Sequence, residues 1–127
     1  YPAHAGATAR AYFAFLSAGQ RQQLMYHRPL AKFSDLTALD AAEIEAEMQL
    51  VAEAGWAYSE GEYDLNTRAL AAPVFLGSRP IGSVSIGEHK REHLGDIRDH
   101  LDVLLRTAGQ IGNLLLSAQS PQRKQHR

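Results

Sequence analysis

The stretch that decides the fold is Arg68–Gly87, RALAAPVFLGSRPIGSVSIG, which holds two apolar runs around a short turn. The segments 68–75 and 81–86 predict two antiparallel strands, with LGSRP as the turn between them. Both faces of the first run are apolar, which is typical of a central strand that is covered on both sides. Pro73 has no amide donor, so we expect a bulge or a strand end at that position.

The second run alternates large and small side chains. The large residues are Ile81, Val84 and Ile86, and the small ones are Gly82, Ser83, Ser85 and Gly87. Small side chains on a sheet face leave room for another group to approach closely. This strand is therefore the first indication of a pocket.

The hairpin is flanked by helical patterns. Asp40 followed by Glu43 is typical of a helix start, and Gly55 suits a left-handed end, so we expect a helix over 41–54. Upstream, the sequence predicts a helix over 7–18 ended by Gly19, then a short second helix in QRQQLMYH. WAYSEGEY, after Gly55, alternates large and polar residues and predicts a further strand.

A long helix is expected over residues 92–118. Apolar residues recur there at spacings of three and four: Leu94, Ile97, Leu101, Leu104, Ala108, Ile111, Leu115 and Ala118. Such a pattern predicts an apolar face that packs on the sheet. Apolar positions outside it, such as Leu105 and Leu116, leave open a further contact with a second copy of the chain.

Composition limits the classes of protein that fit. The chain has 127 residues, a formal net charge of -1 and no cysteine. One domain over 1–118, with a polar, basic tail over 119–127 that frays, suits this length. The charge gives no overall attraction to nucleic acid, and the missing cysteines exclude a disulfide framework and fit a cytoplasmic protein. No apolar run reaches the ~20 residues of a membrane helix.

The elements together predict an α+β fold, an antiparallel sheet flanked by helices. His89, His93, His100 and Asp96 would lie near one helix face, but their basic neighbours make a poor cation site, so we predict no metal. Ser83 and Ser85 have no evident histidine partner, and no phosphate-binding loop is present. We therefore expect neither an enzyme nor a cofactor.

Three segments in order carry a resemblance: AHAGATARAYFAFL, EAGWAYSEGE and RALAAPVFLGSRPIGSVSIG. Over 2–118 the chain resembles the effector-binding domain of IclR-type transcriptional regulators, with Arg68–Phe75 as the most specific match. The resemblance implies a sensor domain related to GAF and profilin-like folds, which binds a small organic acid or aromatic metabolite. It also implies a homodimer or homotetramer, and operator DNA bound through an N-terminal winged helix-turn-helix that this chain lacks. The early strands of the effector domain are expected to be missing as well.

The resemblance also implies an effector site, which would comprise Ala7, Thr8, Ser59, Glu62, Ala69, Ser83, Ser85 and Gly87. Ser59 stands where the family has Asp, Ala69 where it has Cys or Ser, and Gly87 replaces a Ser. The predicted pocket therefore offers fewer hydrogen-bonding groups. Amides in the first turn of the first helix would favour an anionic group, which Thr8 and Ser85 would orient.

Two other interpretations remain open. The chain could be a dimerisation or interaction module whose cavity is filled, or a small hydrolase or lyase that uses the hydroxyls and Glu62. An open cavity near Thr8, Ser59 and Ser85 favours the sensor, whereas side chains filling that space favour the module. A nucleophile and a base at hydrogen-bond distance would favour the enzyme.

Overall fold

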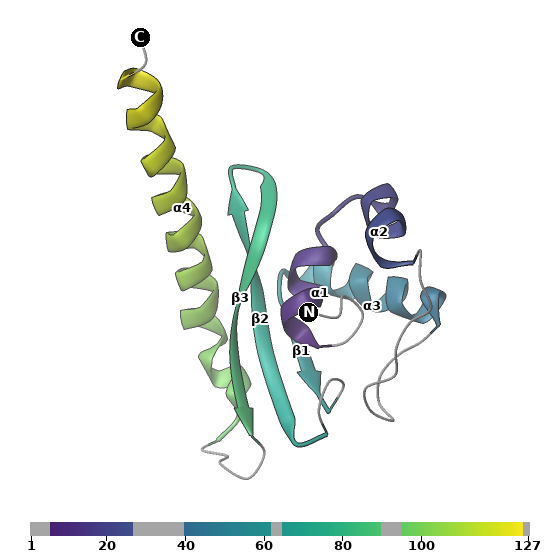
Figure 1. Cartoon of the computed structure of the whole chain (residues 1–127). Helices are drawn as coiled ribbons and strands as arrows, with labels where there is room; N and C mark the ends of the chain where they lie inside the picture. The colour runs from purple at the N-terminus through teal and green to yellow at the C-terminus, as the bar shows by residue number, and fades with distance from the viewer. Residues whose placement is uncertain (1–5, 27–39, 62–64, 90–94, 126–127) are drawn as a thin grey trace.

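A computed structural model describes residues 6–26, 40–61, 65–89 and 95–125 of the chain, with the backbone alone over 120–125. The elements are α1 (Ala7–Phe13), α2 (Ala18–Met25), α3 (Ala41–Ala54), β1 (Ala57–Glu60), β2 (Thr67–Leu76), β3 (Arg79–His89), the 3-10 helix η2 (Ile97–His100) and α4 (Leu101–Gln125). The expected α+β class, an antiparallel sheet with flanking helices, is confirmed (Figure 1).

The sheet has the order β1-β2-β3, so the hairpin's first strand is central, as its two apolar faces predict. Both pairs are antiparallel, and Ala71 lies opposite Ala57 in β1 and Ser85 in β3. The strands run closer to the turn than expected, because Gly77 adopts a positive φ of 64° and lets two residues close the hairpin.

Pro73 was expected at a bulge or a strand end, and this is wrong by one residue. Pro73 lies inside β2 opposite Ser83, and the register shift falls between Val74 and Phe75. The pairing with β1 stops at Ala71, so β1 does not reach Pro73. The missing amide therefore interrupts no bond to that strand.

The two faces of the sheet are covered by different helices. On one face, Leu70, Ala72 and Val74 pack with η2 and with Leu104 and Ala108 of α4. On the other face, Ala7 and Ala11 of α1 pack against Ala57 and Ala71. Figure 1 shows α4 on one side of the sheet and α1 to α3 on the other. Alanines on both sides of the second interface let α1 approach the strands closely.

Helix α3 follows the prediction from its first residue to its last. The Asp40 carboxylate accepts a hydrogen bond of 2.9 Å from the Ala42 amide, and Gly55 ends the helix at a φ of 88°. Ile44 and Met48 are buried against Ala14 and Met25, which attaches α3 to α1 and α2.

The first helices differ from expectation. α1 ends at Phe13, and Gly19 lies inside α2 instead of ending the helix before it. The reason is Ser17, which forms a capping box with Gln20 and starts α2 there. In α3, the Glu45 carboxylate accepts from Arg21 at 2.9 Å and from Tyr26 at 2.6 Å, which ties α2 to α3. The bond from Arg21 is the main reason that the pKa of Glu45 lies below its ordinary value.

The long helix also differs from expectation. Leu94 lies outside the described residues, the 3-10 turn η2 comes first, and α4 begins at Leu101. The helix does not end near residue 118 but continues across Pro121 to Gln125, so the expected tail is helical that far. Its apolar face is buried at Leu104 and Ala108 but exposed by 42% at Leu115, where the sheet no longer covers it.

Candidate functional site

A groove lies where the start of β2 and the end of β3 pass under α1. Its volume is about 520 Å³, and its lining residues are Thr8, Thr67, Arg68, Ala69, Ser85, Gly87, Glu88 and His89. We call it the Ser85 groove. Ala69 pairs with Gly87 across the two strands. Because alanine has only a methyl group and glycine has no side chain, this part of the groove wall is open.

The position of α1 over this groove is fixed by polar bonds to the sheet. The Ser59 hydroxyl accepts a hydrogen bond of 3.0 Å from the Ala7 amide, and the Ser83 hydroxyl donates one of 2.7 Å to the Thr8 carbonyl. The buried guanidinium of Arg10 donates at 2.6 Å to the Tyr58 carbonyl and pairs with Glu47 at 3.4 Å. In the first turn of α1, β1 thus bonds to Ala7 and Arg10, and β3 bonds to Thr8.

The structure brings together four of the eight predicted site residues: Thr8, Ala69, Ser85 and Gly87 line the groove. Ala7 and Ser59 are buried and Ser83 bonds to backbone, so these three position α1 and do not line the groove. The Ala7 amide was expected to favour an anion, but Ser59 already occupies it. Glu62 lies outside the described residues.

Two lining residues were missed by the sequence reasoning. Thr67 and His89 lie opposite each other at the end of the hairpin, one step beyond the Ala69–Gly87 pair on the same face. The signal was available, because side chains two residues apart on a strand share a face. Starting the first strand at Arg68 and ending the second at Ile86 hid it, since β2 begins at Thr67 and β3 ends at His89.

The charges at this end of the hairpin compensate each other. Arg68 and Glu88 are cross-strand partners whose side chains form an ion pair of 3.1 Å, largely shielded from solvent. By alternation from Leu70 and Ile86, which pack in the α4 cluster, this pair belongs to the α4 face. The polar groups that β2 and β3 present on the groove's own face are then Thr67, Ser85 and His89.

The described residues offer no evident reaction centre. They contain no group of three potential metal ligands. His89 ends a strand and His100 ends η2, so these two do not share a helical face with Asp96, and His93 lies outside the described residues. Nor does any described helix have the length and apolarity to cross a membrane.

Comparison with known proteins gives consistent matches. The family described as "Bacterial transcriptional regulator IclR C-terminal" matches residues 1–113. The Pca operon regulatory protein of Acinetobacter baylyi is 28% identical over 119 residues, which are 90% of this chain and 42% of that protein. The chain therefore spans less than half the length of this relative.

Solved structures share the fold. The IclR of Thermotoga maritima matches with a TM-score of 0.80 at 20% identity, over 90% of this chain and 47% of the other. The inducer-binding domain of a PobR double mutant from Acinetobacter, solved as a complex with 3-hydroxybenzoic acid, matches with a TM-score of 0.74 at 19% identity, over 91% of this chain and 66% of the other. These are structures of transcriptional regulators and not of enzymes.

Proposed function

Because the chain belongs to the IclR C-terminal family of bacterial transcriptional regulators, we propose that it senses a small organic or aromatic acid in the Ser85 groove. In this proposal, the whole regulator works in the cytoplasm and binds operator DNA through a part outside this sequence. Copies of the sensor associate as a homodimer or a homotetramer. The acid changes how the DNA-binding parts are arranged.

One observation carries the proposal: α1, β2 and β3 bring Thr8, Ala69, Ser85 and Gly87 to a single groove. Its volume of about 520 Å³ falls in the range of ~300–1,000 Å³ that is usual for small-molecule sites. Within the described part of the chain, the hydroxyls of Thr8 and Ser85 make no hydrogen bond to protein. They are available as donors to a carboxylate, and Ala69 and Gly87 leave space for a flat ring beside it.

The related PobR domain supports an aromatic acid as the first probe, since its structure holds 3-hydroxybenzoic acid in a similar fold. An interaction module without a ligand is the second candidate. It is favoured by the packing of α1 on the sheet through Ala7, Ala11 and Ala71, which are fully buried.

A thermal-shift screen of small carboxylic and aromatic acids, with 3-hydroxybenzoate included, tests the sensor. A ligand that binds only the folded state raises the melting temperature. We expect at least one acid to stabilise the parent chain, and Ser85→Leu to fold but to lose the shift, because leucine would fill the groove. Ser78→Leu in the hairpin turn is the matched control and should keep the shift.

Each result has a distinct meaning. If no acid shifts the melting temperature, the interaction module is favoured over the sensor. If Ser85→Leu responds like the parent, the ligand binds elsewhere and the Ser85 groove is the wrong site.

A further inference from the structure

The Ser85 groove has polar side chains at both ends and none in its middle. Thr8 and Ser85 line the end beneath α1, and Thr67 and His89 line the end where β2 begins and β3 finishes. The Ala69–Gly87 pair lies between these two ends. On each strand the lining residues of this face are two positions apart, so their side chains point to the same side of the sheet.

Gly87 forms the floor in the middle, and no neighbour in the described structure requires a glycine there. Its φ is not positive, and the register of β2 and β3 is unbroken at this position. An added Cβ would meet the Arg68 carbonyl oxygen at 3.9 Å, which is an ordinary contact. Glycine inside a strand often marks a bulge, a bend or the close approach of a ligand. With a bulge excluded, this glycine favours a flat group that lies on the floor.

The distance between the two polar ends limits the size of the ligand. Ser85 and His89 are four residues apart in β3, so their Cα atoms are about 13 Å apart at the usual rise of a strand. Side chains stand roughly perpendicular to a sheet, so their polar atoms are separated by a similar length. A hydrogen bond of about 3 Å at each end leaves about 7 Å between the two polar groups of the ligand. One aromatic ring with substituents at opposite positions spans that length, whereas substituents at adjacent positions do not.

The charges along the groove indicate what the second substituent is. Arg68 also lines the groove, but its guanidinium is paired with the Glu88 carboxylate at 3.1 Å. A second carboxylate on the ligand would therefore meet no uncompensated arginine or lysine among the described lining residues. Threonine and neutral histidine can both donate and accept a hydrogen bond, and a hydroxyl group can do the same. The end formed by Thr67 and His89 therefore matches a hydroxyl better than a second carboxylate.

We infer that Thr67 and His89 determine the specificity of the groove, because they bind a hydroxyl that lies opposite the carboxylate of an aromatic acid. The carboxylate lies at Thr8 and Ser85, and the ring lies over Gly87. Neither Thr67 nor His89 belongs to the site that the family resemblance implies. The inference rests on the proposed function, and its experiment compares related acids so that the two can fail separately.

Calorimetric titration of the 127-residue chain with benzoate, 3-hydroxybenzoate and 4-hydroxybenzoate tests the pair. We expect 4-hydroxybenzoate to bind the parent about tenfold more tightly than benzoate, because its hydroxyl gains two hydrogen bonds, and 3-hydroxybenzoate to gain less than about threefold. His89→Ala and Thr67→Val should each lower the preference for 4-hydroxybenzoate to about threefold. This ratio, unlike either affinity alone, does not change when a variant merely loses stability. His100→Ala is the matched control, since His100 is exposed at the end of η2, and it should keep the full preference.

The outcomes separate this inference from the proposed function. Equal affinities of the parent for benzoate and 4-hydroxybenzoate, or a tenfold preference that survives in both variants, would overturn the inference and leave the sensor intact. Terephthalate, which has a second carboxylate in place of the hydroxyl, should bind no more tightly than benzoate. If it bound more tightly than 4-hydroxybenzoate, the hydroxyl would be the wrong substituent. Binding of none of the acids would overturn the sensor and the inference together.

Gly87→Ala tests the place of the ring. The added methyl group occupies the floor, so the variant should bind benzoate and 4-hydroxybenzoate about fivefold more weakly than the parent. Gly82→Ala is the matched control in the same strand, because its Cβ would meet nothing within 4 Å and Gly82 does not line the groove. Unchanged affinities in Gly87→Ala would place the ring elsewhere and overturn the spacing on which the inference depends.

Discussion

At the scale of the residue, Gly112 decides how closely α4 can approach the sheet. A Cβ built on Gly112 would overlap the carbonyl oxygen of Phe75, so the helix backbone packs directly on that strand. From the sequence alone, Gly112 and Gly109 are both glycines that weaken a helix. The two glycines differ only in their tertiary contacts, which helix propensity does not reflect.

Gly112→Ala should therefore destabilise the fold while Gly109→Ala should not. The extra methyl group at position 112 must displace backbone, which costs about 1–3 kcal/mol and outweighs the gain in helix propensity of about 1 kcal/mol. At position 109 the space is open, so that gain should appear nearly in full. Urea unfolding at a concentration where the chain is monomeric measures both. Equal free energies of unfolding for the two variants would contradict the close contact.

Ser59 is the second decisive residue, because its hydroxyl joins β1 to the start of α1. Its place in the family pattern predicts a ligand contact, but its hydroxyl is buried and accepts from the Ala7 amide. Ser59→Ala leaves that buried amide without its partner, which costs about 1–3 kcal/mol. Ser85→Ala removes a hydroxyl that bonds to no described residue, and should change the free energy of unfolding by less than about 0.5 kcal/mol.

The two serine variants should differ in the opposite sense toward a ligand. Once an acid has been found, Ser85→Ala should weaken its binding in calorimetry, whereas Ser59→Ala should bind it at a temperature where that variant is folded. Loss of binding in a stable Ser59→Ala variant would instead support the ligand contact that the family pattern predicts for Ser59.

At the scale of the element, a helix or strand was predicted well where residues close to it in the sequence determine its bounds or its place. The bounds of α3 were predicted because Asp40 and Gly55 cap the helix through backbone groups in its first and last turns. The central position of β2 was predicted because two apolar faces require two covers. The division of α1 from α2 was missed because the Ser17 capping box competes with Gly19 as a boundary, and the capping box prevails.

The site was partly predictable for the same reason. The alternation along β3 indicated a face of small residues, and Ser85 and Gly87 do line a groove. The hydrogen bonds that position α1 join Ser59 to Ala7 and Ser83 to Thr8. These residues lie far apart in the chain, so no periodic sequence pattern predicts the bonds. The alternation of side chains therefore predicts which residues share a surface. Tertiary structure decides which polar groups on that surface are left to bind a ligand.

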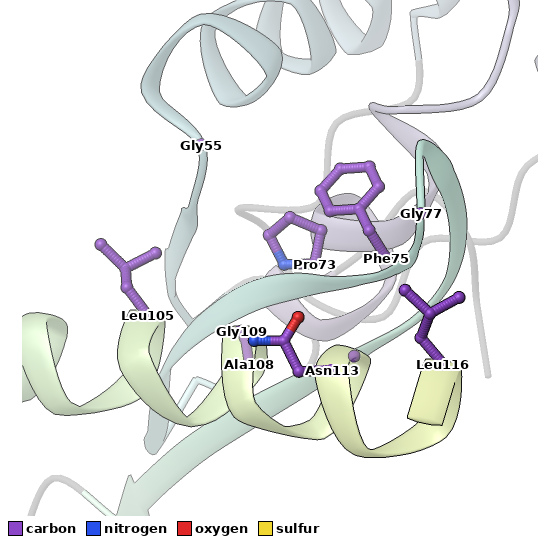
Figure 2. Close-up of a pocket in the computed structure, with 10 residues that line it drawn as sticks. Gly55, Pro73, Phe75, Gly77, Leu105, Ala108, Gly109, Asn113 and Leu116 are labelled. Atoms are coloured by element: carbon purple, nitrogen blue, oxygen red, sulfur yellow. The ribbon is translucent and has the colours of Figure 1, made fainter. Parts of the chain in front are cut away.

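At the scale of the whole molecule, the Ser85 groove and a second groove lie on different parts of one sheet. The second groove has a volume of about 320 Å³ and lies between α4 at Leu105 and Gly109 and β2 at Pro73 and Phe75 (Figure 2). The first is formed beneath α1 at the start of β2, and the second beside α4 near the other end of that strand. β2 connects them. It pairs with β3 along its whole length and with β1 from Arg68 to Ala71, and it packs over both faces. Energetic coupling along a packed element needs two discrete arrangements of that element, and the structure describes one arrangement of β2.

Within this chain we therefore expect ligand binding and self-association to be nearly independent. Coupling between sites is reciprocal. A Leu116→Asp variant, which places a charge on the exposed apolar side of α4, should therefore bind an acid within about fivefold of the parent, or about 1 kcal/mol, and saturating acid should change the dissociation constant of self-association by the same small factor. Calorimetry on the variant and sedimentation with and without acid measure the two sides separately. A coupling of a hundredfold, equal in both experiments, would mean that β2 has two arrangements and that the acid selects between them. Weak coupling would instead assign the transmission of the ligand signal to parts of the regulator outside this sequence.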